Sequence, residues 1–264
     1  MSYGLSKHCS NVWRAFIALF ALWIIAPNAQ AVPGIKDQWH FFCGPGQVND
    51  KLIQRARSKT GGGGLKAGIA QLNYACLLEL REAQLFQERF RKWSDGGGKG
   101  PQPKPDNRGS TQALSQAIAT LAAAYKAAPN NPKATYNYAL ALAVKGDVLT
   151  VNIFDDLMTK HKDDKLTGDA YLVLGDHYFE RGDIPKAFRE YGNSLKRGRP
   201  LIQAYTRYKM AWVNFAVAQE QKNNQKQLKS IQELVSLKRR LDSEKGKREK
   251  RLADTISNDV AELL

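Results

Sequence analysis

The sequence predicts an all-α fold, in which helix-turn-helix repeats stack as a short α-solenoid behind a helical N-terminal segment. In its longest apolar stretches, hydrophobic residues recur three and four positions apart, which is the spacing of one helix face. Small residues recur every thirty-six positions, at Ala139, Gly175 and Ala211, and Gly146 and Gly182 keep the same interval. Small side chains let two helices approach closely, and glycine ends a helix with little strain. These observations favour stacked helical hairpins.

Residues 1–31 have the features of a secretory signal peptide. Lys7 and Arg14 precede an apolar run at 15–26, and an A-x-A cleavage site follows at 29–31. The alternative is an uncleaved membrane anchor. However, a run of twelve apolar residues spans only about 18 Å of helix, less than the roughly 30 Å of a bilayer core. We therefore expect a periplasmic or secreted mature protein.

The mature chain is strongly basic. The whole sequence has a net charge of +15, and cleavage after Ala31 removes two cations and no acids, which leaves 38 Lys and Arg against 25 Asp and Glu. Outside the cytoplasm, the available polyanions are membrane surfaces, lipopolysaccharide, acidic wall polymers and acidic proteins, so we expect no nucleic-acid partner. A basic surface that stays solvated is the simpler alternative.

Two cysteines remain after the predicted cleavage. Cys43 and Cys76 are candidates for a disulfide, because an exported compartment is oxidising. Cys76 also lies on an apolar helix face, so a buried thiol is the alternative for it. His40 stands three residues before Cys43, but no paired C-x-x-C or H-x3-H spacing accompanies it, and we expect no metal site.

Residues 32–93 form the predicted helical N-terminal region, and residues 94–110 a flexible linker. A long helix with one apolar face is indicated by Ile69, Leu72, Cys76, Leu80, Ala83, Phe86, Phe90 and Trp93. The segment after it is rich in glycine, proline and charge, and we place a domain boundary there. Its glycine runs do not fit the phosphate-loop pattern.

Residues 111–228 resemble tetratricopeptide repeats, which have a period near thirty-four built from helix, turn and helix. The best copy follows the family pattern with Tyr171, Leu174, Gly175, Tyr178, Ala187 and Tyr191. The copies that begin at Pro132 and Ala204 keep the first helix and depart in the second helix or the turn. The stretch from Tyr171 to Val217 is also similar to exported tetratricopeptide proteins of predatory and gliding bacteria.

The resemblance implies a right-handed solenoid without enzymatic activity, whose first helices line a partner-binding groove. Catalytic and cofactor-binding residues are not expected, because no hydrolase, zinc-protease or dinucleotide motif occurs. Exposed positions of the first helices would contact the partner. Carried over copy by copy, these positions are Tyr136, Leu140, Leu172, Asp176, Phe179, Tyr205, Tyr208, Trp212 and Phe215. The alternative for each aromatic residue among them is packing against the neighbouring repeat.

Residues 229–264 form a predicted basic helical segment. Between Lys229 and Arg251, nine basic residues stand against four acids, above leucines and an isoleucine at helical spacing. The segment is either a solvated capping helix or a contact for an anionic surface. The sequence thus predicts an exported adaptor that binds a protein of the cell envelope. The alternative is a basic module that attaches to anionic wall polymer or to a membrane surface.

Overall fold

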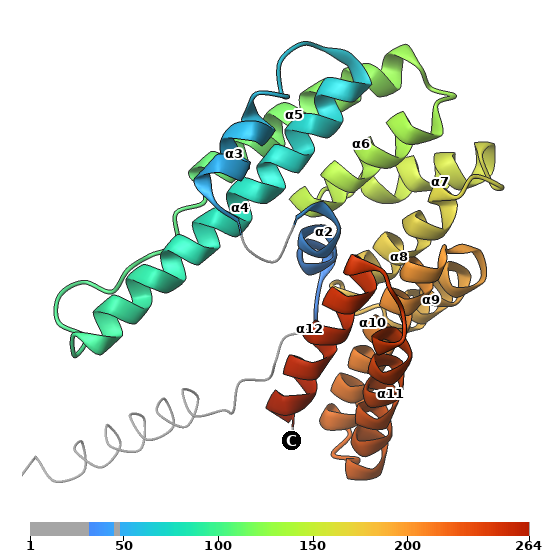
Figure 1. The fold of residues 1–264 in the computed structure, drawn as a ribbon. Coiled ribbons are helices and arrows are strands. Elements are labelled where there is room, and N and C mark those ends of the chain that lie inside the picture. The colour runs from blue at the N-terminus through green and yellow to red at the C-terminus, as the bar shows by residue number, and fades with distance from the viewer. Residues whose placement is uncertain (1–31, 45–47, 264) are drawn as a thin grey trace, which may run out of the picture. The chain divides into compact units, whose positions relative to one another are not determined.

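The computed structural model describes residues 32–44 and 48–263, and the predicted signal peptide at 1–31 lies outside them. Pro33 to Leu264 form one compact unit. Within the described ranges every regular element is a helix, which confirms the predicted fold class (Figure 1). The helices are α2 Ile35–Cys43, α3 Asp50–Arg57, α4 Gly64–Asp95, α5 Arg108–Ala127, α6 Pro132–Lys145, α7 Thr150–Lys160, α8 Leu166–Phe179, α9 Ile184–Arg197, α10 Pro200–Glu220, α11 Asn224–Asp242 and α12 Lys247–Leu263.

Neighbouring helices pack in the order of the chain. The hairpins are α4 with α5, α6 with α7, α8 with α9, and α10 with α11, and α12 packs on α10 and α11. The first helices of successive hairpins also touch, since α4 contacts α6, α6 contacts α8, and α8 contacts α10. This arrangement is that of a helical repeat solenoid, in which each hairpin buries the apolar face of the next.

The turns inside two hairpins have the geometry that their glycines predict. Gly146 and Gly182 adopt φ angles of 80° and 76°, in the left-handed region. The hairpin α10–α11 has no glycine at its turn, and Lys222 takes the left-handed conformation instead, with a φ of 52°. A left-handed conformation costs a residue other than glycine about 1–2 kcal/mol. The third copy therefore turns without a glycine, and its turn at Lys222 stands 40 positions after Gly182 instead of 36.

The small residue of the best repeat copy lies against an aromatic ring. A Cβ atom added to Gly175 would fall on the ring of Tyr191, which belongs to the second helix of the same hairpin. Tyr191 itself is fully buried. Glycine at this position therefore sets how closely α8 approaches α9.

The predicted domain boundary at 94–110 is wrong. Helix α4 continues to Asp95, and α5 then packs back along it, with Gly68 against Leu121. Near the start of α5, the Ser110 amide donates a hydrogen bond of 3.1 Å to Glu82. The linker is therefore the loop of the first hairpin. Its glycine and proline content predicts a loop, but composition does not show whether the flanking helices pack together.

The second predicted boundary, at Lys229, falls inside α11, which begins at Asn224. Asn223 caps this helix, because its side chain accepts a hydrogen bond from the Lys226 amide at 3.0 Å. The basic residues that marked the boundary lie on α11, in the loop after it and at the start of α12, and the apolar side of α11 belongs to the last hairpin. Charge therefore changes along this helix without any break in its packing.

Candidate functional site

The first helices α4, α6, α8 and α10 form one face of the unit, called here the first-helix face. The nine predicted partner contacts come from α6, α8 and α10. Six of them are buried, so the expectation that they are exposed is wrong for these six. The buried residues are Leu172, Asp176, Tyr205, Tyr208, Trp212 and Phe215, and the half-buried ones are Tyr136, Leu140 and Phe179.

Helix α2 lies against the first-helix face and accounts for part of this burial. It contacts α4, α6 and α8. The rings of Phe41 and Phe42 pack on Tyr205 of α10, with ring centres 4.8 Å and 5.4 Å away. Ile35 and Trp39 enter the hydrophobic core and are only 2% and 3% exposed. An isolated helix of nine residues is unstable in water, so these contacts are what keep α2 helical.

The N-terminal end of α2 is held by a carboxylate from α8's hairpin. The first amides of a helix have no partner within the helix and carry a partial positive charge. Glu180, which follows α8, accepts a hydrogen bond of 2.8 Å from the Ile35 amide. Asp37 accepts one of 2.7 Å from the Gly34 amide. Two carboxylates therefore satisfy this end.

The C-terminal end of α2 is held by a cation from α12. The last carbonyls of a helix lack partners and carry a partial negative charge. The guanidinium of Arg251 donates hydrogen bonds to the carbonyl oxygens of Phe41 and Gly44. It also lies over the Phe41 ring, with 4.6 Å between the guanidinium carbon and the ring centre. The two ends of α2 thus meet charges of the sign that the helix dipole favours.

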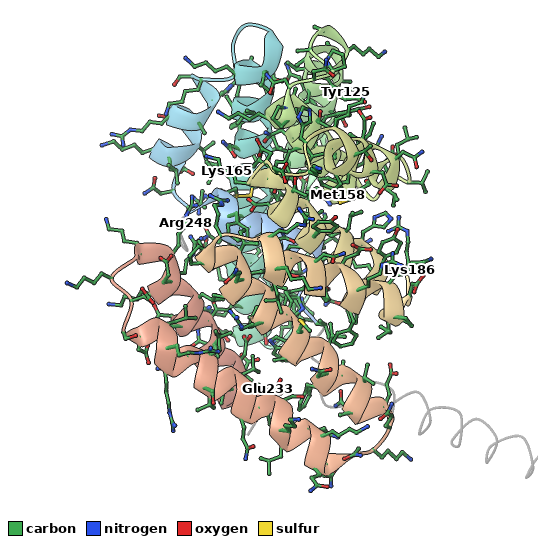
Figure 2. All side chains as sticks on the ribbon, turned by 90° about the vertical axis from the view of Figure 1, so that its right-hand side faces the viewer. Tyr125, Met158, Lys165, Lys186, Glu233 and Arg248 are labelled. Carbon is green, nitrogen blue, oxygen red and sulfur yellow. A yellow bond between two sulfur atoms is a disulfide. The ribbon has the colours of Figure 1, made fainter. Side chains whose placement is uncertain are left out.

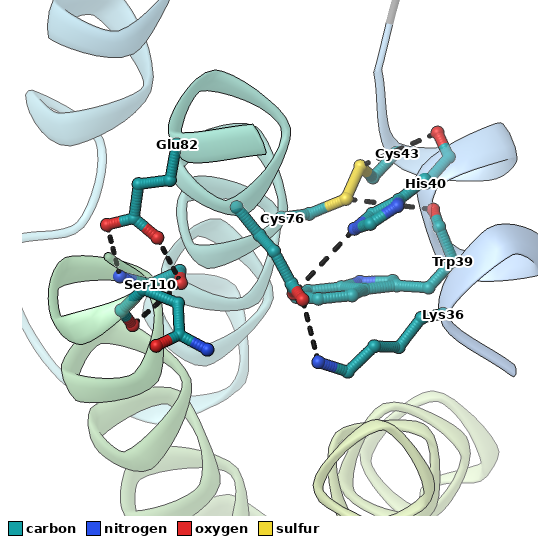
Figure 3. A network of polar contacts seen from close by, with 9 residues as sticks. Lys36, Trp39, His40, Cys43, Cys76, Glu82 and Ser110 are labelled. Carbon is teal, nitrogen blue, oxygen red and sulfur yellow. Dashed lines mark hydrogen bonds and ion pairs between the residues drawn. A yellow bond between two sulfur atoms is a disulfide. The ribbon is translucent and has the colours of Figure 1, made fainter. Parts of the chain in front are cut away.

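The side of α2 is fixed to α4, as Figure 3 shows. Cys43 and Cys76 form a disulfide, as the sequence suggested. Lys36 lies 2.7 Å from one oxygen of Glu79, and His40 lies 3.7 Å from the other. Burial raises the pKa of Glu79, but the nearby His40 ring and the hydrogen bond from Lys36 outweigh it and hold that pKa below its ordinary value. The cysteine and histidine considered for a metal are used in these contacts.

Two further predicted contact residues, Tyr208 and Trp212, form hydrogen bonds with α12. Asp259 accepts a hydrogen bond of 2.7 Å from the Tyr208 hydroxyl and one of 3.0 Å from the Trp212 indole. Burial raises the pKa of Asp259 above its ordinary value, although both hydrogen bonds oppose the rise. Phe215 packs edge-on against Trp212, with ring centres 5.9 Å apart. The aromatic residues of α10 therefore hold α12 in place.

Asp176 belongs to a buried ionic cluster. Its side chain and that of Lys209 on α10 are both 0% exposed, and their charged atoms lie 3.1 Å apart. The Tyr191 hydroxyl donates a hydrogen bond of 2.7 Å to the same carboxylate oxygen. Burial raises the pKa of Asp176 to about 6, against the opposing effect of Lys209. The cluster joins α8, α9 and α10 from inside, so Asp176 is not available to a partner.

Two of the half-buried residues, Tyr136 and Leu140, have internal contacts as well. Tyr136 and Leu140 pack against the main hydrophobic core, and the Tyr136 ring lies 6.0 Å from that of Phe154. Burial raises the pKa of Tyr136 far above its ordinary value. Phe179 is the last residue of α8. All nine predicted residues therefore lie on first helices, and most of their surface is used inside the chain.

Basic residues of the C-terminal segment lie mainly on the surface of α11 and α12, and Figure 2 shows Arg248 near the start of α12. Lys238 is half-buried and pairs with Asp242 at 2.6 Å, and Arg251 holds α2 as described. The exposed residues are Lys229, Arg239, Arg240, Lys245, Lys247, Arg248 and Lys250. The segment therefore combines a packed apolar side with a cationic outer side.

The described residues contain no group of three His, Cys, Asp or Glu side chains placed to hold a metal ion. None of the helices in the same ranges is both long and apolar enough to cross a membrane. The buried Asp176 and Lys209 and the half-buried Asp259 instead hold helices together.

The sequence did not reveal that α2 would cover the first-helix face. Glu180, Arg251 and Asp259, which hold α2 and α12, stand far from their partners in the chain and carry no motif. One signal was present. The segment "IKDQWHFFC" places an isoleucine, a tryptophan and a phenylalanine on one side of a short helix directly behind the predicted cleavage site.

Comparison with known proteins gives no relative: no family model, no curated protein and no solved structure matches this chain.

Proposed function

We propose that the protein is an exported, non-enzymatic scaffold of tetratricopeptide type in the bacterial cell envelope. Its first-helix face binds a short amphipathic helix of a partner protein, in the place where α2 lies. The observation that carries this proposal is α2 itself, a nine-residue helix that packs on the first helices and is held at both ends by side chains from elsewhere in the chain. An apolar face that accepts an amphipathic helix is a recurrent mode of protein recognition.

The chemistry of the α2 contacts defines the partner helix. It has an aromatic anchor, as Trp39 provides, and free terminal backbone groups that Glu180 and Arg251 can hold. The contacts with the ends involve backbone atoms and therefore suit any helix of about this length. The apolar side chains supply the selection between partners.

The disulfide supports the exported location, because bonds of this kind persist in oxidising compartments. It joins the last residue of α2 to α4 and leaves the helix before it attached by non-covalent contacts alone. A partner helix could therefore replace residues 35–42 while the chain stays tethered at Cys43.

The test compares partner capture by the mature chain and by a chain with weakened α2. Trp39→Ala removes a buried side chain from α2 and lowers the population of the covered state. If a partner competes with α2, its apparent affinity rises with the fraction of open protein. We expect the Trp39→Ala variant to capture a discrete envelope protein at least about tenfold better than the parent chain.

Phe188→Ala is the control, because it removes an aromatic side chain from α9, a second helix that makes no contact with α2. Capture should then equal that of the parent chain. Equal capture by all three chains would show that the partner binds elsewhere. Recovery of only salt-eluted glycopolymer or lipid, alike in all three, would contradict the adaptor function.

A further inference from the structure

The end of α4 forms an arm without a core of its own. Ser110, near the start of α5, lies beside Glu82, so the rest of α4 runs past α5, as Figure 1 shows. The loop at 96–107 returns along this part of the helix, and the backbone of Val48 faces Gln84 where the arm starts. None of the residues from 78 to 109 is buried. We call residues 83–107 the arm.

An aromatic stripe runs along the arm. Phe86, Phe90 and Trp93 follow each other at helical spacing, with ring centres 6.0 Å and 5.6 Å apart. The stripe lies on the side of α4 that packs on α5, in the part of α4 that extends beyond the start of α5. The loop covers it in part, because Trp93 donates a hydrogen bond of 3.3 Å to the Gly100 carbonyl. Phe90 nevertheless stays 37% exposed, and the neighbouring Leu85 stays 38% exposed.

The charges of the arm are arranged around this stripe. At about 100° per residue, Arg89 borders the stripe, whereas Glu88 and Asp95 lie on the opposite side of the helix. The arm has five cations, Arg89, Arg91, Lys92, Lys99 and Lys104, against three acids. All five cations are exposed, and none is in an ion pair with another described residue.

We propose that the arm binds the surface of an anionic lipid membrane, with Leu85, Phe90 and Trp93 entering the interface and Arg89 and Lys92 meeting lipid phosphates. Aromatic and leucine side chains flanked by cations are what an interfacial helix requires, and tryptophan favours the level of the headgroups. The acids on the opposite side of the helix then face water. Because the arm contributes nothing to the core, it can change its surroundings without loss of the fold.

The arm offers its own probe. Three tryptophans remain after the predicted cleavage, and Trp39 and Trp212 are 3% and 2% exposed, whereas Trp93 is only half-buried. The mature full-length chain is mixed with phosphatidylglycerol vesicles whose acyl chains carry bromine, a short-range quencher. We expect quenching of the tryptophan emission and co-flotation with the vesicles. Quenching should be absent with phosphatidylcholine vesicles and should weaken as salt is added.

Variants separate the contributions. Trp93→Phe should abolish the quenching and keep flotation, since phenylalanine retains an apolar ring. The double change Phe90→Ala with Trp93→Ala should lower flotation at least about tenfold, and so should Arg89→Gln with Lys92→Gln. Glu88→Gln with Asp95→Asn, on the opposite side, should not lower it. Circular dichroism verifies that each variant is folded.

Three results would overturn the proposal: no binding to phosphatidylglycerol vesicles, binding that is unchanged by the aromatic variant, or quenching that survives Trp93→Phe. Binding of purified cell-wall polymer that depends on the same residues, without binding of vesicles, would assign the arm to a glycopolymer and equally reject a membrane.

Discussion

At the scale of single residues, the least expected feature is a charged pair inside the repeat core. Asp176 was predicted to contact a partner, yet it lies with Lys209 where neither side chain has any exposed surface. Moving two charges from water into the core carries a desolvation free energy that a pair on the surface largely avoids. The hydrogen bond from Tyr191 offsets part of it. The pair links the first helices of two successive hairpins and thereby fixes how they stack.

The first prediction concerns this pair. Lys209→Met leaves the Asp176 carboxylate buried without a cation, and loss of one partner of a buried pair costs about 3–5 kcal/mol. The double variant Lys209→Met with Asp176→Asn removes both charges and should recover a good part of that loss. Urea unfolding at neutral pH is measured for Lys209→Met, for Asp176→Asn and for the double variant. If the effects of the two single changes simply add in the double variant, the residues are not coupled.

The second prediction concerns pH. Burial and the charge of Arg181 lower the pKa of His177 to about 4, below the ordinary value of 6.5. Between these values the unfolded chain binds more protons, so the histidine makes the free energy of unfolding rise with pH. Asp176 acts oppositely, because its pKa is raised to about 6 and the folded chain binds the extra proton above pH 3.8.

Urea unfolding from pH 4 to pH 7 separates the two groups. The stability advantage of the parent chain over His177→Gln should grow as pH rises through this window. Its advantage over Asp176→Asn should shrink as pH rises toward the raised pKa of about 6. Parallel curves for all three chains would show that neither group titrates differently in the folded state.

At the scale of elements, the hairpin of α8 and α9 depends on one close contact. Gly175 to Ala would drive a methyl group into the Tyr191 ring, and overpacking of this kind costs about 1–3 kcal/mol. Gly192 in α9 is the matched control, since a Cβ there meets nothing within 4 Å. Gly192→Ala should stabilise the protein by roughly 0.5–1 kcal/mol. Thermal unfolding measures both, and equal effects would remove the reason given for glycine at 175.

Much of the hairpin structure could be predicted from the sequence. The interval of thirty-six residues located Gly175 and the turns at Gly146 and Gly182, because helix contact and helix termination are local requirements. The pairing of α4 with α5 was missed because the loop between them resembles a domain linker. The turn at Lys222 was missed because lysine rarely adopts the left-handed conformation and so does not predict a turn.

The predicted contact residues illustrate the same limit. Tyr205, Tyr208 and Trp212 do lie on a first helix, as the repeat pattern requires. Their burial depends on Phe41 and Asp259, which lie more than forty positions away in the chain. Periodicity gives the face on which a side chain lies, but it does not give the segment that covers that face.

At the scale of the whole molecule, helices from both ends of the described range cover the first helices. Helix α2 comes from the start of the described chain and α12 from its end, and Arg251 joins them. The N-terminal segment from Pro33 and the repeats therefore form one folding unit. The disulfide adds to this by closing a long loop between α2 and α4.

Reduction of the disulfide tests that contribution. Cys43 and Cys76 are 33 positions apart, and closing a loop of this length stabilises a protein by about 3–4 kcal/mol in the chain-entropy treatment. The mature chain has no other cysteine after the predicted cleavage, so the variant with serine at both positions is a clean reference. We expect urea unfolding of the reduced chain to match this variant. If the urea midpoint of the parent chain did not change on reduction, the disulfide would not stabilise the protein.

Hydrogen exchange of the α2 amides in residues 32–264 tests most directly whether α2 occupies the first-helix face. Exchange should be slow at residues 39–43, and at least about tenfold faster there in Trp39→Ala and Arg251→Gln, with α9 unchanged in both. Exchange in the parent chain as fast as that of an unstructured peptide would show that α2 does not hold this face.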